Sequence, residues 1–254
     1  MKNMKDKQLQ RLIFTALMVA IGIVLSNFVS ISYPPNSTII RFGIGYLPLI
    51  IVSIILGPKV GLVAAIIQDI LGYFVYMLIY GFASGPFFPG FTFNSILYGI
   101  VPGLIYNLKI NRKNLFLYMN FILMTMMLIL GIWGLIEIDF IIEIIENKLS
   151  VDMSFNPWII YSMLGMGILG VLSGYIFLYI NRNEDDSSQR IIFSVIILQI
   201  VVTLVLTPLW VTILYSSATF LPQLPLRIIK TPLEVFIYTV LLLRLIKVFK
   251  NYKI

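Results

Sequence analysis

Long apolar runs separated by short polar turns dominate this chain. A membrane-spanning helix needs about 20 mostly apolar residues. Eight segments approach or exceed that length, namely 9–29, 42–58, 60–79, 92–110, 115–136, 157–181, 190–216 and 228–250. Glycine, proline and asparagine fill the turns between them, as at Gly57-Pro58 and Ser84-Gly85-Pro86. The pattern predicts an all-α integral membrane protein, a polytopic helical bundle, in which 42–58 is the shortest span.

Composition supports the membrane assignment and removes several classes of chemistry. Apolar residues make up 59% of the chain and charged residues 11%, whereas a soluble domain has about 45–50% and about 25%. The chain has no cysteine and no histidine, which excludes thiolate metal sites, cysteine nucleophiles and imidazole catalysis. It also lacks a GxxxxGK[ST] phosphate loop. We therefore expect no enzyme, metal or cofactor in this chain, and any ATP must be hydrolysed by another subunit.

The lysines and arginines predict the orientation of the chain in the membrane. Fourteen of the 18 fall on one side of the predicted spans, and positive charge marks the cytoplasmic side. The other four are Arg41, Lys148, Arg227 and Lys230. Both termini are therefore predicted to be cytoplasmic, in a multi-pass protein of the cell membrane. A cleaved signal peptide ending at 30–32 is a poor alternative, because the apolar run before it is too long.

The segment 136–152 has a different pattern from the spans. Its isoleucines follow helical spacing, and Asp139, Glu143 and Glu146 form another face. This favours an amphipathic helix on the outer membrane surface. A solvated helical loop between two spans is equally compatible with the pattern.

Three charged residues share one face at the outer end of the last span. Arg227, Lys230 and Glu234 follow at i, i+3 and i+7. A charge near the bilayer centre costs about 2.5–3.5 kcal/mol, less near the interface, so such residues usually serve function. The alternative is that Lys230 and Glu234 only satisfy each other at i, i+4.

Further polar and aromatic residues are predicted near the same outer side. Asp69 lies mid-span with Tyr73 one turn on, and Asn94 enters the fourth span from outside. A carboxylate at that depth needs hydrogen-bond donors or a proton, so Asp69 either meets a ligand or bonds a neighbouring helix. Trp210 extends a stripe of threonines in the seventh span, although a membrane-interface anchor is its usual role.

The predicted outer loop at 84–92, SGPFFPGFT, is the most informative stretch. Phe87, Phe88 and Phe91 lie in a proline and glycine frame. Aromatic faces stack on flat heterocycles, and a rigid frame lowers the ordering cost of binding. The alternative is that the rings dip into lipid. Together, the aromatic rings, cations, carboxylate and amide predict a small ligand that is planar, rich in hydrogen bonds and anionic at one end.

The chain resembles the folate-specific S component, the substrate-binding subunit of energy-coupling-factor (ECF) vitamin transporters. The resemblance rests on RFGIGYLP at 41–48, DILGY at 69–73, GPFFPGFT at 85–92, and the tail from PLW at 208–210 to RIIKTPLE at 227–234. It implies a membrane subunit that captures folate outside and delivers it inward when docked to a T protein and two ATPases. In that family an AxxxA surface of the first helix meets the T protein, and Ala16 and Ala20 match it.

The chain departs from the six-helix pattern of that family. We expect a single membrane domain over 1–254, with an S-component-like core at 1–111 and 190–254. The segment 112–189 would be an insert of two spans joined by the amphipathic segment. Two spans restore the polarity, so the last helices keep their orientation.

Three alternatives compete with this interpretation. The ligand could be another vitamin or heterocycle, since S components share their architecture. The chain could instead be a stand-alone secondary transporter with Asp69 or Glu234 as a proton carrier, but no clear inverted repeat of broken helices appears. An intramembrane enzyme would need a carboxylate pair or a metal and is remote.

Overall fold

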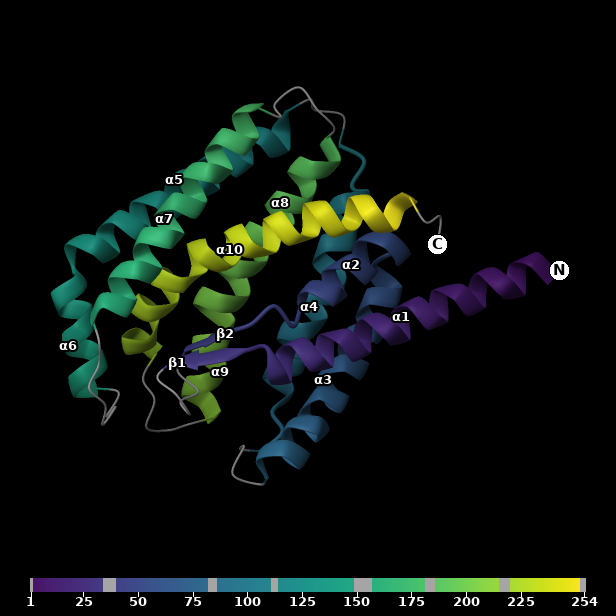
Figure 1. Cartoon of the computed structure of the whole chain (residues 1–254), viewed down its shortest axis with the longest axis horizontal. Coiled ribbons are helices and arrows are strands. Elements are labelled where there is room, and N and C mark those ends of the chain that lie inside the picture. Colours follow the sequence, from purple (N-terminus) through teal and green to yellow (C-terminus); the bar gives the residue numbers. More distant parts are fainter. Residues whose placement is uncertain are drawn as a thin grey trace. The chain divides into compact units, whose positions relative to one another are not determined.

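The computed structural model describes residues 2–33, 40–81, 86–110, 114–148, 157–180, 186–214 and 220–251 (Figure 1). The amino-terminal elements are α1 (Lys2–Phe28), β1 (Ile31–Tyr33), β2 (Ile40–Phe42), α2 (Leu47–Leu56), α3 (Pro58–Tyr80) and α4 (Pro89–Asn107). The later elements are α5 (Leu115–Ile136), α6 (Ile138–Lys148), α7 (Pro157–Ile180), α8 (Asp186–Leu198), η2 (Gln199–Leu206), α9 (Thr207–Leu214) and α10 (Phe220–Asn251).

The described chain is a polytopic helical membrane protein, as the sequence predicts. Five helical segments are long and apolar enough to cross a membrane, namely Asp6–Phe28, Pro58–Ile79, Leu115–Ile136, Tyr161–Ile180 and Asp186–Leu214. The predicted spans at 92–110 and 228–250 correspond to helices α4 and α10, which are not among those five. In α10, four charged residues (Glu234, Arg244, Lys247 and Lys250) interrupt the apolar run after residue 233.

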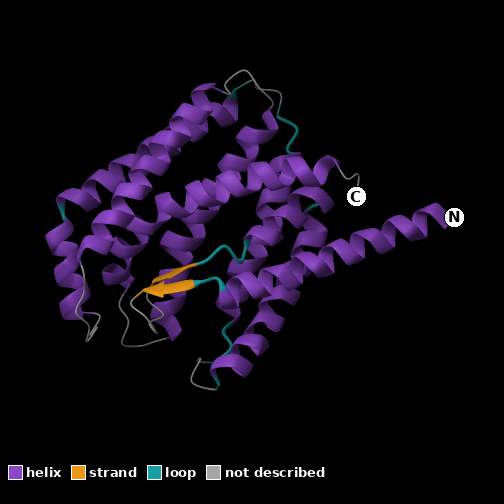
Figure 2. Cartoon of the chain, viewed as in Figure 1, coloured by secondary structure: helices purple, strands orange, loops and turns teal. Residues whose placement is uncertain are grey.

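Two details of the predicted fold are wrong. A two-stranded sheet of β1 and β2 interrupts the otherwise helical chain, shown in orange in Figure 2. Helix α2 has only 10 residues, about 15 Å at 1.5 Å per residue, and cannot cross a hydrocarbon core of about 30 Å. It starts after Gly43 and Gly45, with Pro48 in its first turn, so the segment 42–58 begins as strand and turn.

By their contacts, the residues divide into two compact units. The first contains Met1–Ile31, Gly43–Lys109 and Val240–Ile254, and the second contains Ser32–Phe42 and Ile110–Thr239. In the first unit α3 and α4 approach closely where glycines face each other: a Cβ on Gly61 would lie 1.9 Å from the carbonyl oxygen of Gly99. Small residues permit such close packing of helices in a membrane.

In the second unit, two glycines of α7 lie against neighbouring helices. A Cβ on Gly174 would lie 2.9 Å from Cε of Met124 in α5, and one on Gly167 would lie 3.3 Å from Cβ of Pro232 in α10. Helices α5 and α7 run side by side in this unit (Figure 1). The predicted insert therefore packs on the part of α10 that carries the predicted cations.

The amphipathic helix α6 turns its apolar face to protein. Ile138 and Ile141 are buried in one apolar cluster with Met163, Leu164 and Ile229, while Asp139 and Glu143 are exposed. The helix is amphipathic, as predicted, but these two isoleucines are covered by α7 and α10 and are not available to lipid. Glu146 falls among the residues whose side chains are not described.

Helices α8, η2 and α9 form one continuous span with a π-helical centre. The hydroxyl of Thr207 donates to the carbonyl oxygen of Val202 at 2.7 Å, five residues earlier. Pro208 follows directly and cannot donate an amide hydrogen to the helix. Wider turns of this kind relax the backbone next to such a break and often accompany functional sites.

Candidate functional site

The α10 charge cluster, which we define as Arg227, Lys230 and Glu234, lies buried on one face of α10 in the second unit. The three residues are 4%, 6% and 7% exposed. The Lys230 Nζ atom donates to Glu234 Oε1 at 3.0 Å. Sequence spacing correctly placed them on one face, and the i, i+4 pair considered as an alternative is formed.

That ion pair does not neutralise the cluster. Arg227 contributes a second positive charge, and its Nη2 atom reaches Gln223 Oε1 only at 3.5 Å. Its buried Nε atom has no hydrogen-bond partner among the described residues. Two cations and one carboxylate leave a net charge of +1 with an unused donor. Because an unneutralised buried charge is costly, the site is suited to an anionic ligand.

Phe42, the last residue of β2, lies close to Lys230. The Lys230 Nζ atom lies 5.7 Å from the centre of the Phe42 ring, within cation–π range. Phe42 also packs against the apolar cluster of α6 and α7. Arg41 lies in β2 beside it, but its side chain is outside the described part of the chain, so its predicted role stays a prediction.

Asp69 in the first unit bridges α3 and α4. Its Oδ2 accepts a hydrogen bond from the Thr92 hydroxyl at 2.6 Å, and its Oδ1 accepts one from the Ser95 hydroxyl at 3.0 Å. Asp69 is half-buried, and each carboxylate oxygen can accept a further bond. The structural alternative is thus realised, and the carboxylate retains capacity for a ligand.

The aromatic residues predicted at the outer loop form two edge-to-face pairs in the first unit. The ring centres of Tyr73 and Phe87 are 5.4 Å apart, and those of Phe88 and Phe91 are 5.8 Å apart. Phe87 is exposed and the other three rings are half-buried. Asn94, in the next turn of α4, is buried. Tyr73 lies on α3 and Phe91 on α4, the two helices that Asp69 bridges, while Phe87 and Phe88 directly precede α4.

Trp210 and its predicted stripe lie on the π-containing span of the second unit. Trp210 is half-buried in α9. The Thr203 hydroxyl donates to the buried Gln199 side chain at 2.6 Å, and Thr207 bonds the backbone. The threonines are therefore engaged within their own helix.

Ala16 and Ala20 are both exposed on α1. Bulky neighbours on the same helix, Leu12, Ile13 and Leu17, are exposed as well. Ala64 and Ala65 of α3, in contrast, are fully buried. The predicted partner surface is thus accessible in the chain by itself.

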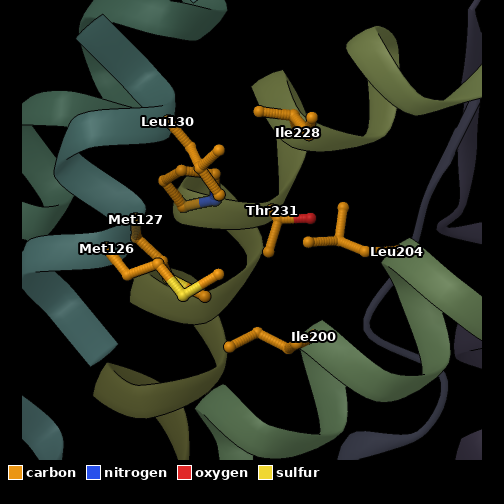
Figure 3. A pocket seen from close by; sticks show the side chains of 8 residues that line it. Met126, Met127, Leu130, Ile200, Leu204, Ile228 and Thr231 are labelled. Carbon is orange, nitrogen blue, oxygen red and sulfur yellow. The ribbon is translucent and has the colours of Figure 1, made fainter. Parts of the chain in front are cut away.

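A groove in the second unit is too small and too apolar to serve as the predicted ligand site (Figure 3). It has room for about 10 Å³, roughly one water molecule, against about 300–1,000 Å³ for typical ligand pockets. It is lined by Met126, Met127 and Leu130 of α5, Ile200 and Leu204 of η2, and Ile228, Thr231 and Pro232 of α10. None of these was a predicted site residue.

The predicted site residues divide between the two units. The first unit holds Asp69, Tyr73, Phe87, Phe88, Phe91, Asn94, Ala16 and Ala20, and the second holds Arg41, Trp210, Arg227, Lys230 and Glu234. Within each unit the structure brings together Asp69 with the α4 hydroxyls, and Lys230 with Glu234. That both sets contact one ligand stays a prediction.

Sequence reasoning missed several polar partners of these residues. Thr92 and Ser95 flank Asn94, and Gln223 stands four residues before Arg227. Helical spacing from Arg227 could have found Gln223. Thr92 and Ser95, in contrast, reach Asp69 from another helix and carried no such signal. Gln68, next to Asp69, is buried and donates to the Gly45 carbonyl oxygen at 3.0 Å; an amide in an apolar run was its signal.

A family model, described as ECF transporter, substrate-specific component, matches residues 10–146, more than half of the chain. The chain belongs to this family. The match passes through α5 and most of α6, beyond residue 111, where the core was predicted to be interrupted. The S component is thus a transporter subunit and not an enzyme.

One curated relative matches part of the chain. The S component is 30% identical over 117 residues to a protein of Clostridium novyi (strain NT) named folate transporter FolT. The alignment covers 46% of this chain and 62% of that relative, less than two thirds of its length. No solved structure matches the chain.

Proposed function

We propose that this S component captures folate outside the cell and delivers it inward when docked to a T protein and two ATPases. The observation that carries the proposal is the α10 charge cluster. Its buried net positive charge suits an anionic ligand, as does the Arg227 Nε atom, which has no hydrogen-bond partner in the part of the chain that the structure describes. The similarity to a folate transporter supports the choice of ligand.

The two ends of folate suit the two sets of predicted residues. Its glutamate carries two carboxylates, for which Arg227, Lys230 and Arg41 supply cations; guanidinium groups pair with carboxylates especially well. Its flat pterin suits the rings of Tyr73, Phe87, Phe88 and Phe91, and its hydrogen-bonding edge suits Asp69 and Asn94. Trp210 and Glu234 complete the proposed contact set.

The proposal includes an orientation and a domain organisation. Both termini lie in the cytoplasm, because fourteen of the 18 basic residues are on that side of the predicted spans. The residues 1–111 and 190–254 form the S-component-like core, and 112–189 is an insert with two spans. Ala16 and Ala20 form the surface for the T protein, since small residues let another helix approach closely.

Transport measured in vesicles separates this proposal from a proton-coupled transporter. We expect folate uptake only when the T protein, the ATPases and ATP are present, and no response to an imposed pH gradient. The reason is that the Glu234 carboxylate is already engaged in an ion pair with Lys230 at 3.0 Å, and the Asp69 carboxylate accepts hydrogen bonds from Thr92 and Ser95. Uptake by the S component alone, driven by a pH gradient, would assign the chain to the other class.

A further inference from the structure

We propose that α6 and α7 position the cations of the α10 charge cluster, and that Gly167 and Gly170 of α7 are positioning residues for the anionic end of the ligand. The identity of that ligand rests on the proposed function. The positioning itself rests on contacts within the second unit.

The first observation is the close approach of α7 to α10. A Cβ on Gly170 would lie 2.9 Å from Cβ of Phe236 and 3.1 Å from its Cγ. Both atoms sit near the α10 backbone, so rotation of the Phe236 side chain cannot make enough room. A Cβ on Gly167 would lie 3.3 Å from Cβ of Pro232. The absence of side chains at these two glycines therefore sets the separation of α7 from α10.

The second observation is that the same core holds the residues around the cations. Ile229 of α10 is 1% exposed and packs with Ile138 and Ile141 of α6. It is the sequence neighbour of Lys230 and is two residues from Arg227. A shift of α6 or α7 would therefore move the turn that carries both cations.

A third contact links this core directly to the ammonium group of Lys230. Phe42 packs against the apolar cluster of α6 and α7 with one part of its surface, and its ring lies 5.7 Å from Lys230 Nζ. A shift of α6 or α7 would therefore move the Phe42 ring and change the surroundings of the Lys230 ammonium. Glu234, one turn on, pairs with the same ammonium at 3.0 Å.

The helical turn of α10 at Pro232 can move when α6 or α7 shifts. Proline lacks an amide hydrogen, so the carbonyl oxygen of Ile228 loses its usual helical partner and α10 bends more easily there. Ile228 and Pro232 also line the apolar groove between α10, α5 and η2 (Figure 3). A substitution that pushes on α10 is therefore expected to bend the helix at this turn, where one backbone hydrogen bond is already absent. The strength of an ion pair or hydrogen bond to a ligand carboxylate depends on its distance from the cation, so a displacement of Arg227 and Lys230 would weaken binding.

The test compares Gly170→Ala with Gly165→Ala, one added methyl group in each case. Gly165 lies in the same helix and has no atom within 4 Å of its would-be Cβ, so it is the matched control. The first readout is the affinity of purified protein for folate and for pteroate, which lacks the glutamate. The second is labelling of Lys230 by an amine-reactive ester, measured by mass spectrometry relative to exposed Lys59, and it needs no ligand.

We expect Gly170→Ala to lose about tenfold in folate affinity, less in pteroate affinity, and to label several-fold more at Lys230 relative to Lys59. Gly165→Ala should match the parent in folate affinity, in pteroate affinity and in the labelling of Lys230. Unchanged labelling and an unchanged folate-to-pteroate ratio in Gly170→Ala would overturn the proposal. If the parent fails to bind folate, the proposed function fails, and the labelling comparison still decides the positioning. Gly167→Ala, where the contact is looser, replaces Gly170→Ala if that variant does not fold.

Discussion

Arg227→Gln is expected to weaken folate binding about 100-fold, or roughly 2.7 kcal/mol, while leaving the protein as stable as the parent or more stable. The Arg227 guanidinium is buried, and its Nε atom has no partner among the described residues. Its burial therefore costs free energy in the empty protein and is compensated only when an anion binds. If Arg227 destabilises the empty protein but binds the ligand, replacing it should lower the affinity for folate and keep or raise the free energy of unfolding.

Two further variants give this prediction its controls. Arg244→Gln makes the same change on an exposed part of α10 and should leave binding unchanged. Lys230→Met should instead lower the free energy of unfolding by about 3–5 kcal/mol, because it leaves Glu234 buried without its partner. Titration calorimetry and thermal unfolding measure both quantities. An Arg227→Gln protein that binds folate like the parent, or that loses stability together with binding, would contradict the assignment.

Ala16→Leu and Ala20→Leu are expected to abolish ATP-dependent uptake while leaving folate binding in detergent intact. Both alanines are exposed on α1 and one helical turn apart. Because both positions are exposed, a leucine there is not expected to overpack the described core, but it would hold a partner helix away and forfeit the dispersion contacts of close packing. Uptake into vesicles containing the T protein and ATPases is the measurement.

Two further substitutions serve as controls for the prediction on α1. Ala16→Ser keeps the residue small and should retain uptake. Ala64→Leu places the same bulk at a fully buried position of α3 and should lose thermal stability and binding together, by about 1–3 kcal/mol for overpacking. Uptake at the parental rate by Ala16→Leu and Ala20→Leu would place the coupling surface elsewhere.

Periodicity predicted the long helices well because the bilayer imposes both their length and their apolarity. The helices α1, α3, α5, α7 and α8–α9 follow directly from that constraint. The sheet of β1 and β2 was missed because three-residue strands carry too little pattern to distinguish from the end of an apolar run. Helix α2 was overextended for the same reason, since Phe42 and the glycines after it add apolar length without helical structure.

The site was predictable where residue spacing alone decides the geometry. The shared face of Arg227, Lys230 and Glu234 follows from i, i+3 and i+7, and the Lys230–Glu234 pair is formed. The partners of Asp69 were not predictable, because Thr92 and Ser95 reach it from another helix. The burial of Ile138 and Ile141 was likewise decided by packing on α7 and α10. An amphipathic pattern identifies an apolar face but not what covers it.

Titration of the purified protein with single vitamins tests the central claim most directly. Binding of folate, thiamine and riboflavin can be followed by calorimetry and by quenching of Trp210 fluorescence in a variant whose other two tryptophans, Trp133 and Trp158, are replaced by phenylalanine. The account predicts saturable binding of folate and reduced folates with no response to thiamine or riboflavin. Binding of thiamine or riboflavin as tight as that of folate, or tighter, would contradict it.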